Sequence, residues 1–133
     1  MADYVFYNAN PEKLIESDCV CRAISNALGI DYKTIKRKLY HVGELFDCEQ
    51  LAVSCYHHLL EHVYGLVTYD AAERTVRELV EQYPTKTLII RMAGHLTMAA
   101  KGIVYDLWDC REEIADVFWI VPTKSCYTRT NML

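Results

Sequence analysis

Cys19 is the residue of this sequence whose setting most favours chemical reactivity. It follows Ser17 and Asp18, either of which can cap a helix, and Gly29 can end the helix that they begin. We therefore expect a helix over residues 18–28 with Cys19 in its first turn. The helix dipole and the free N–H groups of that turn favour a thiolate over a thiol. A cysteine in this position is a candidate nucleophile.

A histidine and an aspartate stand on two β-rich segments later in the chain. These segments, residues 94–100 and 103–109, flank a Lys101-Gly102 pair that is typical of a hairpin turn. His95 lies on the first segment and Asp106 on the second. A carboxylate can orient an imidazole, and the imidazole can accept the proton of a thiol. The spacing therefore predicts a base and its orienting group on neighbouring antiparallel strands.

The register of this hairpin decides which side chains meet. Pairing positions 100 and 103 places Thr97 opposite Asp106 and Trp108 opposite His95. Because side chains alternate between the faces of a strand, all four share one face. Asp106 is then the diagonal neighbour of His95, within reach of its ring. Trp108 is expected to shield this pair from water and to contact the substrate.

Together, these residues carry a resemblance to a known family. The motifs are Asp18-Cys19-Val20-Cys21-Arg22-Ala23-Ile24, Gly94-His95-Leu96-Thr97-Met98 and Gly102-Ile103-Val104-Tyr105-Asp106-Leu107-Trp108-Asp109. In order and content they resemble small phage and prophage proteins of the papain-like cysteine peptidase superfamily. The resemblance implies Cys19 as nucleophile, His95 as base and Asp106 as orienter. It also implies a papain-like α+β fold, in which the nucleophile helix packs on a C-terminal antiparallel sheet.

The resemblance further implies a type of reaction and of partner. Enzymes of this kind act through the thiol on an amide, isopeptide or thioester carbonyl and need no cofactor or metal. The expected partner is a protein or peptide substrate, and a host protein is a possible one. A catalytically silent papain-like module that binds a host protein is an alternative within the same fold.

One feature departs from the pattern of the superfamily. Papain-like peptidases place an amide donor, usually glutamine, about six residues before the cysteine, where it completes the oxyanion hole. Lys13 occupies that position here. Asn8 and Asn10 are nearby amides that could replace it, with the backbone N–H of Cys19 as the second donor.

Length and composition are those of one globular domain. The chain has 133 residues, of which 52% are hydrophobic and 24% charged. We expect a single domain over residues 1–133, with a helical part at about 11–83 and an antiparallel sheet at about 86–122. Absence of a long apolar run and of a signal-like N-terminus favours a cytoplasmic location. The net charge of −4 argues against membrane and nucleic-acid partners.

The hydrophobic periodicity predicts the following elements. Helices are expected at 18–28, 31–41, about 47–63 and 70–83, and strands at 88–92, 94–100, 103–109 and 117–121. Residues 4–7 are expected to form a short strand or an aromatic plug. The six cysteines are expected to be free thiols, metal ligands or catalytic groups, because no secretory signal accompanies them.

Two other patterns suggest different functions. The segment from Arg22 to Leu39 has the small-residue and apolar spacing of a helix-turn-helix, and its second helix carries basic side chains that could meet phosphates. These are Lys33, Lys36, Arg37 and Lys38. Cys55, His58 and His62 lie on one predicted helical face at the spacing of zinc ligands, with His57 and Cys48 as further candidates.

Overall fold

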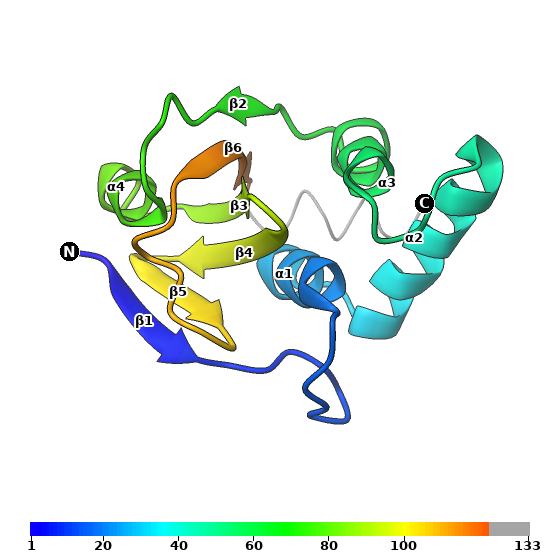
Figure 1. The fold of residues 1–133 in the computed structure, drawn as a ribbon, viewed down its shortest axis with the longest axis horizontal. Coiled ribbons are helices and arrows are strands. Elements are labelled where there is room, and N and C mark those ends of the chain that lie inside the picture. Colours follow the sequence, from blue (N-terminus) through cyan, green and yellow to red (C-terminus); the bar gives the residue numbers. More distant parts are fainter. Residues whose placement is uncertain (123–133) are drawn as a thin grey trace.

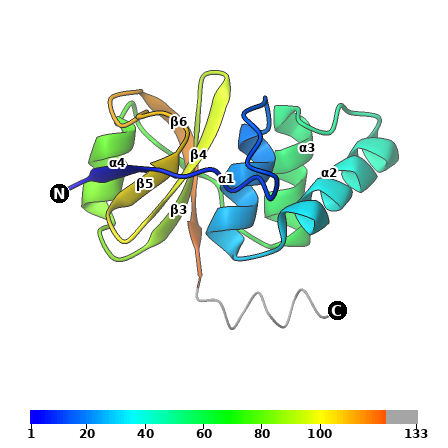
Figure 2. The ribbon, with the colours of Figure 1, turned by 90° about the horizontal axis from the view of Figure 1, so that it is seen from below.

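The sheet of this protein lies between two groups of helices, as the computed structural model of residues 1–122 shows (Figures 1 and 2). The helices are α1 (Cys19–Leu28), α2 (Tyr32–Phe46), α3 (Val53–His58), the π-helical turn η1 (Leu59–Val63) and α4 (Val76–Gln82). The strands are β1 (Asp3–Phe6), β2 (Tyr69–Asp70), β3 (Thr87–Met92), β4 (His95–Ala100), β5 (Ile103–Asp106) and β6 (Ala115–Val121). The fold is therefore α+β, as expected from the sequence.

The six strands follow the order β1-β5-β4-β3-β6-β2. All neighbouring strands are antiparallel except β1, which pairs in parallel with β5. The expected antiparallel arrangement of the C-terminal strands is confirmed for β3, β4, β5 and β6. The parallel strand β1, from the N-terminal part of the chain, makes the whole sheet mixed. The N-terminal strand covers an edge of β5 whose backbone groups would otherwise lack partners. It also positions the end of β5, because the Tyr4 hydroxyl and the Tyr7 N–H both donate to the carbonyl oxygen of Asp106, at 3.1 and 3.0 Å.

Two apolar clusters lie on opposite faces of the sheet. Ile89 of β3 packs toward α1, α2 and α3, whereas its neighbours Leu88 and Ile90 pack toward α4. All three are fully buried. The alternation follows from the pleat of the strand, and burial on both faces explains why β3 reads as a continuous apolar run.

The predicted register of the β4–β5 hairpin is confirmed. Ala100 pairs with Ile103, Ala99 with Val104 and Met98 with Tyr105. Lys101 and Gly102 form the turn with φ angles of 51° and 82°. Two successive positive φ angles give the turn whose twist matches that of a two-residue hairpin.

The region after α1 differs most from expectation. Helix α2 runs through Gly43 to Phe46 instead of stopping near His41, and the next helix starts at Val53 instead of about Asp47. The intervening loop is closed by a disulfide between Cys48 and Cys55, whose Cα atoms are 6.3 Å apart. The expectation that no cysteine forms a disulfide was therefore wrong. The end of α2 brings these two sulfurs together, and that approach depends on tertiary geometry.

The fourth predicted helix begins six residues late. Thr75 caps α4 and forms a capping box with Glu78, so the helix starts at Val76. Upstream of the cap, Tyr69 and Asp70 form β2 at the edge of the sheet. The described residues include no helix with the length and apolar character of a membrane span.

Candidate active site

Cys19 is the first residue of α1 and is half-buried. Its side chain lies near enough to the imidazole of His95 and the backbone N–H of Leu96 on β4 for both to act on the charge of the thiol. Burial alone would raise the pKa of this thiol. The hydrogen bonds from His95 and Leu96 and the positive charges of His95 and Arg22 outweigh burial and lower the pKa below that of an ordinary thiol. Cys19 is thus set to carry a negative charge.

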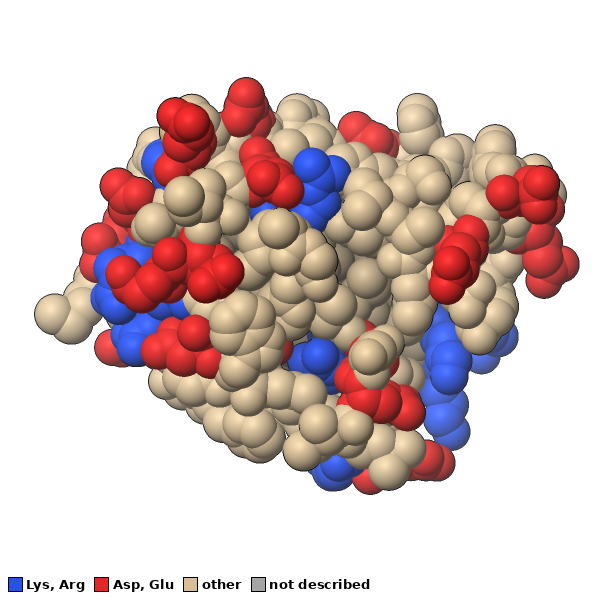
Figure 3. Space-filling view, viewed as in Figure 1, with Lys and Arg blue, Asp and Glu red and all other residues tan. Residues whose placement is uncertain are grey.

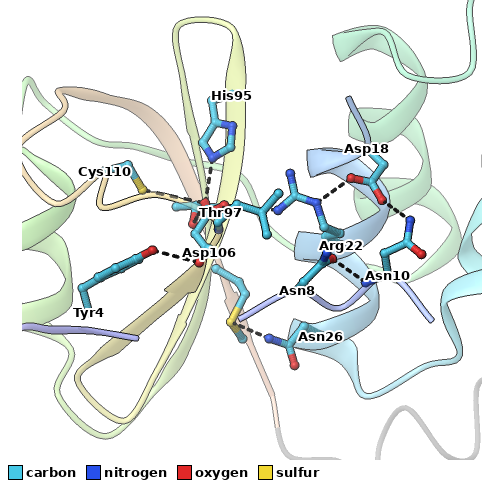
Figure 4. A network of polar contacts seen from close by, with 12 residues as sticks. Tyr4, Asn8, Asn10, Asp18, Arg22, Asn26, His95, Thr97, Asp106 and Cys110 are labelled. Atoms are coloured by element: carbon cyan, nitrogen blue, oxygen red, sulfur yellow. Dashed lines mark hydrogen bonds and ion pairs between the residues drawn. The ribbon is translucent and has the colours of Figure 1, made fainter. Parts of the chain in front are cut away.

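His95 joins the thiol to a carboxylate. Its Nε2 lies 2.7 Å from Oδ2 of Asp106, and its other ring nitrogen points away from Asp106 (Figure 4) and is the one left to meet Cys19. Burial lowers the pKa of His95, but the hydrogen bonds to Asp106, Cys110 and Cys19 and the charge of Asp106 raise it to about 11. With the pKa of the thiol lowered and that of the imidazole raised, the favoured state is a thiolate–imidazolium pair.

Asp106 is held in place from several directions. Besides His95, it accepts hydrogen bonds from the Thr97 hydroxyl at 2.6 Å, the Leu107 N–H at 2.7 Å and Arg22 Nη1 at 3.2 Å. Only 2% of its surface is exposed. Burial would raise its pKa, but the hydrogen bonds from His95 and Thr97 lower it overall, so the carboxylate stays ionised. A carboxylate with these contacts can fix the tautomer and orientation of His95.

Arg22 connects the start of α1 to this carboxylate, a role that the sequence analysis did not assign. Its guanidinium donates from Nε to Asp18 at 2.6 Å and from Nη1 to Asp106 at 3.2 Å, and all three side chains are buried (Figure 4). Asp18 also accepts from Tyr32 at 2.7 Å and Asn10 at 2.9 Å. The separation of Asp18 and Arg22 by four residues on one helix was the available signal, since side chains at that spacing meet.

Trp108 lies against the imidazole as expected, with 5.0 Å between the ring centroids of Trp108 and His95. The strand predicted to reach residue 109 ends at Asp106, so Trp108 lies in the bend after β5 and not on the strand. It covers the histidine, whose side chain is 11% exposed, but is itself 43% exposed. The indole can therefore contact both His95 and a bound substrate.

Asn8 and Asn10 are buried in the loop before α1 and hold that loop together. The Asn8 amide donates to the Leu14 carbonyl at 2.8 Å, and its oxygen accepts from the Asn10 N–H at 3.0 Å. The Asn10 amide donates to Glu16 at 3.1 Å and to Asp18 at 2.9 Å. Both N–H groups of Asn10 are therefore in use, so the geometry does not favour it as an oxyanion donor. Asn8 keeps one N–H that no protein group in residues 1–122 takes up.

Among residues 1–122, one group of side chains brings potential metal ligands together: His95, Asp106 and Cys110, within 4.8 Å of one another. The sequence analysis did not place Cys110 here; its sulfur lies 3.9 Å from Asp106 Oδ2. Two ligands of tetrahedral zinc would stand roughly 3.3 Å apart. The 2.7 Å between His95 Nε2 and Asp106 Oδ2 is shorter than that and is the length of a hydrogen bond, so this pair is not spaced as two zinc ligands.

The other predicted zinc set does not assemble. Cys55 is bonded to Cys48, so it offers no thiolate, and the rings of His58 and His62 are tilted at 35° with their centroids 4.8 Å apart. His57 instead contacts Arg91.

The basic side chains of α2 keep a mostly exposed face. Lys33, Lys36 and Arg37 are exposed, and Lys38 lies over the ring of Tyr64, with 5.1 Å from Nζ to the ring centroid. Helices α1 and α2 follow one another through a short turn at residues 29–31, and α1 packs against β4 and carries the Cys19 site.

The face shown in Figure 3 is hollowed between the half that contains the sheet and the half that contains α1, α2 and α3.

Comparison of the chain with protein-family models, with curated proteins and with solved structures finds no match in any of the three. What the site can do must therefore be inferred from its own geometry.

Proposed function

We propose that this protein is a thiol-dependent hydrolase or acyl transferase with a papain-like arrangement of nucleophile, base and orienting carboxylate. Its substrate is a protein or peptide that offers an amide, isopeptide or thioester carbonyl. The observation that carries the proposal is the hydrogen bond of 2.7 Å between His95 and the buried Asp106, with Cys19 placed where His95 lowers the pKa of its thiol. The resemblance of the sequence motifs to small phage proteins of the papain-like superfamily points to the same chemistry.

The reaction follows from the charge state of the pair. The Cys19 thiolate attacks the carbonyl carbon and forms a C–S bond, and the charge moves to the carbonyl oxygen. The intermediate collapses as the C–N bond breaks, and the His95 imidazolium donates its proton to the departing nitrogen. His95, now neutral, accepts a proton from water or an amine, which attacks the thioester and releases the acyl group. Breaking the C–S bond restores the thiolate.

The open start of α1 supplies a donor for the oxyanion. The Asp18 side chain makes no capping hydrogen bond to the first turn, and its oxygens instead bind Arg22, Tyr32 and Asn10. The backbone N–H of Cys19 is thus left for the oxyanion, at the positive end of the helix. The remaining amide N–H of Asn8 is the second donor in this proposal.

The test is the rate of iodoacetamide alkylation of each cysteine against pH, followed by mass spectrometry. Because the pKa of Cys19 is lowered, its rate should reach a plateau at a pH below that of an ordinary thiol, near 8.5. In His95→Ala the hydrogen bond and the positive charge are lost, so the pKa should rise. The rate at pH 7 should then fall about tenfold, since fewer molecules carry the thiolate.

Cys21 is the internal control because it lies two residues away on the same helix. Burial raises its pKa to about 11, so it should stay unreactive at neutral pH in both proteins. Slow alkylation of Cys19, unaffected by His95→Ala, would rule out the catalytic proposal. A silent protein-binding module or a DNA-binding protein would then be the remaining interpretations, and the latter predicts salt-dependent DNA binding that Lys36→Ala weakens.

A further inference from the structure

Arg91 is a cation beside the nucleophile that the proposed reaction does not use. It stands on β3 directly opposite Leu96 of β4, and the N–H of Leu96 contacts the sulfur of Cys19. On its other side it pairs with Val117 of β6. The side chains of Leu96 and Val117 belong to the apolar cluster that faces α1, as does Cys19. The pairing of β3 with β4 therefore places Arg91 on the strand next to β4, which carries Leu96 and His95 beside the Cys19 thiol.

The guanidinium of Arg91 is only partly occupied. Its Nη1 lies 2.9 Å from Nε2 of His57, its only hydrogen-bond partner among residues 1–122. Asp116 is the nearest carboxylate, with Oδ2 at 3.7 Å from Nε, beyond hydrogen-bonding distance. The Asp116 side chain is 49% exposed, and an ion pair so open to water binds its partners weakly. Most of the N–H donors of Arg91 thus remain available.

His57 orients this cation without neutralising it. Burial and the nearby charge of Arg91 lower the pKa of His57, and Glu61 only partly opposes them, so the ring is neutral at pH 7 and can accept from Arg91. The ring is held edge-on to Trp119 with 4.9 Å between centroids. Arg91 is therefore anchored at one nitrogen and has a fixed direction, as a bidentate anion site requires.

Tyr56 packs beside this group, with 5.5 Å between its ring centroid and that of His57 and 6.4 Å to that of Trp119. It is buried, and burial raises its pKa to about 12, with Arg91 opposing the shift and the charge of Cys19 adding to it. Tyr56 belongs to the apolar cluster against which Cys19 packs. Arg91 lies on the same face of the sheet, opposite Leu96 of that cluster.

We propose that Arg91, oriented by His57, binds a carboxylate of the substrate, so that the enzyme selects peptides with an acidic side chain next to the reacting carbonyl. The inference rests on the proposed thiol chemistry and adds the substrate class. An acidic residue fits because a guanidinium and a carboxylate form two parallel hydrogen bonds, which a neutral amide cannot match.

The experiment uses peptidyl vinyl sulfones, which alkylate a reactive thiol irreversibly, and measures the second-order rate of labelling at Cys19. Three probes differ only in the residue next to the electrophile, which is glutamate, glutamine or lysine. A fourth carries glutamine there and a carboxylate beyond the sulfone, in the place of a peptide C-terminus. The glutamate probe should react about tenfold faster than the glutamine probe, as a charge-assisted hydrogen bond predicts. The lysine probe should be the slowest.

Three variants show whether Arg91 is responsible. Arg91→Gln should bring the glutamate-to-glutamine rate ratio close to one, whereas Arg91→Lys should keep part of the preference. Asp116→Asn should increase the ratio, because it removes the competing carboxylate. Arg37→Gln, an exposed arginine on α2, is the matched control and should leave the ratio unchanged.

The iodoacetamide rate of Cys19 separates the two proposals, because this reagent is small and neutral. If that rate is fast in every variant but Arg91→Gln leaves the glutamate preference intact, the carboxylate site is disproved and the thiol chemistry stands. A fourth probe that reacts faster than the glutamate probe would overturn the choice of an acidic side chain in favour of a C-terminal carboxylate. Slow alkylation of Cys19 in the wild type would overturn both proposals.

Discussion

Two cysteines on one helix illustrate how the surroundings of a residue decide its chemistry. Cys19 and Cys21 are about 200° apart around the axis of α1. The first faces His95 and the N–H of Leu96, and its pKa is lowered; the second is buried, and its pKa is raised to about 11. The same side chain thus becomes a nucleophile or an inert core residue within two positions.

Arg22 is the residue on which the geometry of the site most depends. It is the only cation that contacts both Asp18 and Asp106 in the described part of the chain, and all three are buried. A buried cation is tolerated when carboxylates surround it, and buried carboxylates in turn need the cation. Arg22 therefore fixes the start of α1 relative to the end of β5, and with it the nucleophile relative to the base.

Arg22→Met should destabilise the fold by about 3–5 kcal/mol, because it leaves two buried carboxylates without their shared cation. The measurement is the free energy of unfolding from urea denaturation at pH 7. Arg37→Met is the control, since Arg37 is exposed and, within residues 1–122, bonds only to Thr34, and it should change stability by less than about 0.5 kcal/mol. Equal stabilities of the two variants would contradict a structural role for Arg22.

At the scale of elements, the close approach of α2 to the following loop explains an unusual glycine. Gly43 lies inside α2, where glycine is normally unfavourable. A Cβ atom at this position would stand 2.7 Å from the carbonyl oxygen of Cys48. The glycine therefore lets the loop fold back onto the helix and bring Cys48 to Cys55.

Gly43→Ala should lower the stability of the protein, whereas the same change in an ordinary helix raises it by about 0.5–1 kcal/mol. The added methyl group would force the loop away from α2, at a cost of about 1–3 kcal/mol. Glu44→Ala, at the exposed neighbouring position, controls for the helix propensity of alanine. A gain in the midpoint of urea unfolding for Gly43→Ala would refute the contact.

For the whole molecule, the central strand β3 couples the two apolar clusters. Ile89 belongs to the cluster under α1, α2 and α3, and Ile90 to the cluster under α4. The two residues are adjacent in the chain and fully buried. Because one strand serves both clusters, loss of either should loosen the other, and the described residues should unfold as one unit.

Ile89→Ala and Ile90→Ala should each cost about 2–5 kcal/mol, since each leaves a cavity in a packed interior. Both should shift the unfolding curve measured by tryptophan fluorescence and the one measured by far-ultraviolet circular dichroism by the same amount. Ile114→Ala, at an exposed isoleucine, should shift neither. Separate transitions for the two signals would show that the clusters unfold independently.

Much of the site could be predicted from local sequence. The helix start expected at residue 18 and the stop at Gly29 predicted α1, although the Asp18 side chain makes no capping hydrogen bond. The turn at residues 101–102 predicted the register that brings His95 to Asp106. These signals are local, because caps and two-residue turns depend on a few neighbouring residues. The resemblance of the motifs then grouped the cysteine with the other two residues.

Only the tertiary structure decided the contacts between segments far apart in the chain. β1 pairs with β5 across about 100 residues, and Arg22 reaches Asp106 from another element. The Cys48–Cys55 bond, although short in sequence, depends on how α2 packs on the next loop. Periodicity reports which face of an element is buried, but it does not say against which partner. The sequence by itself therefore determined the helix of the nucleophile and the hairpin of the base, and the packing between them determined the charge state of the site.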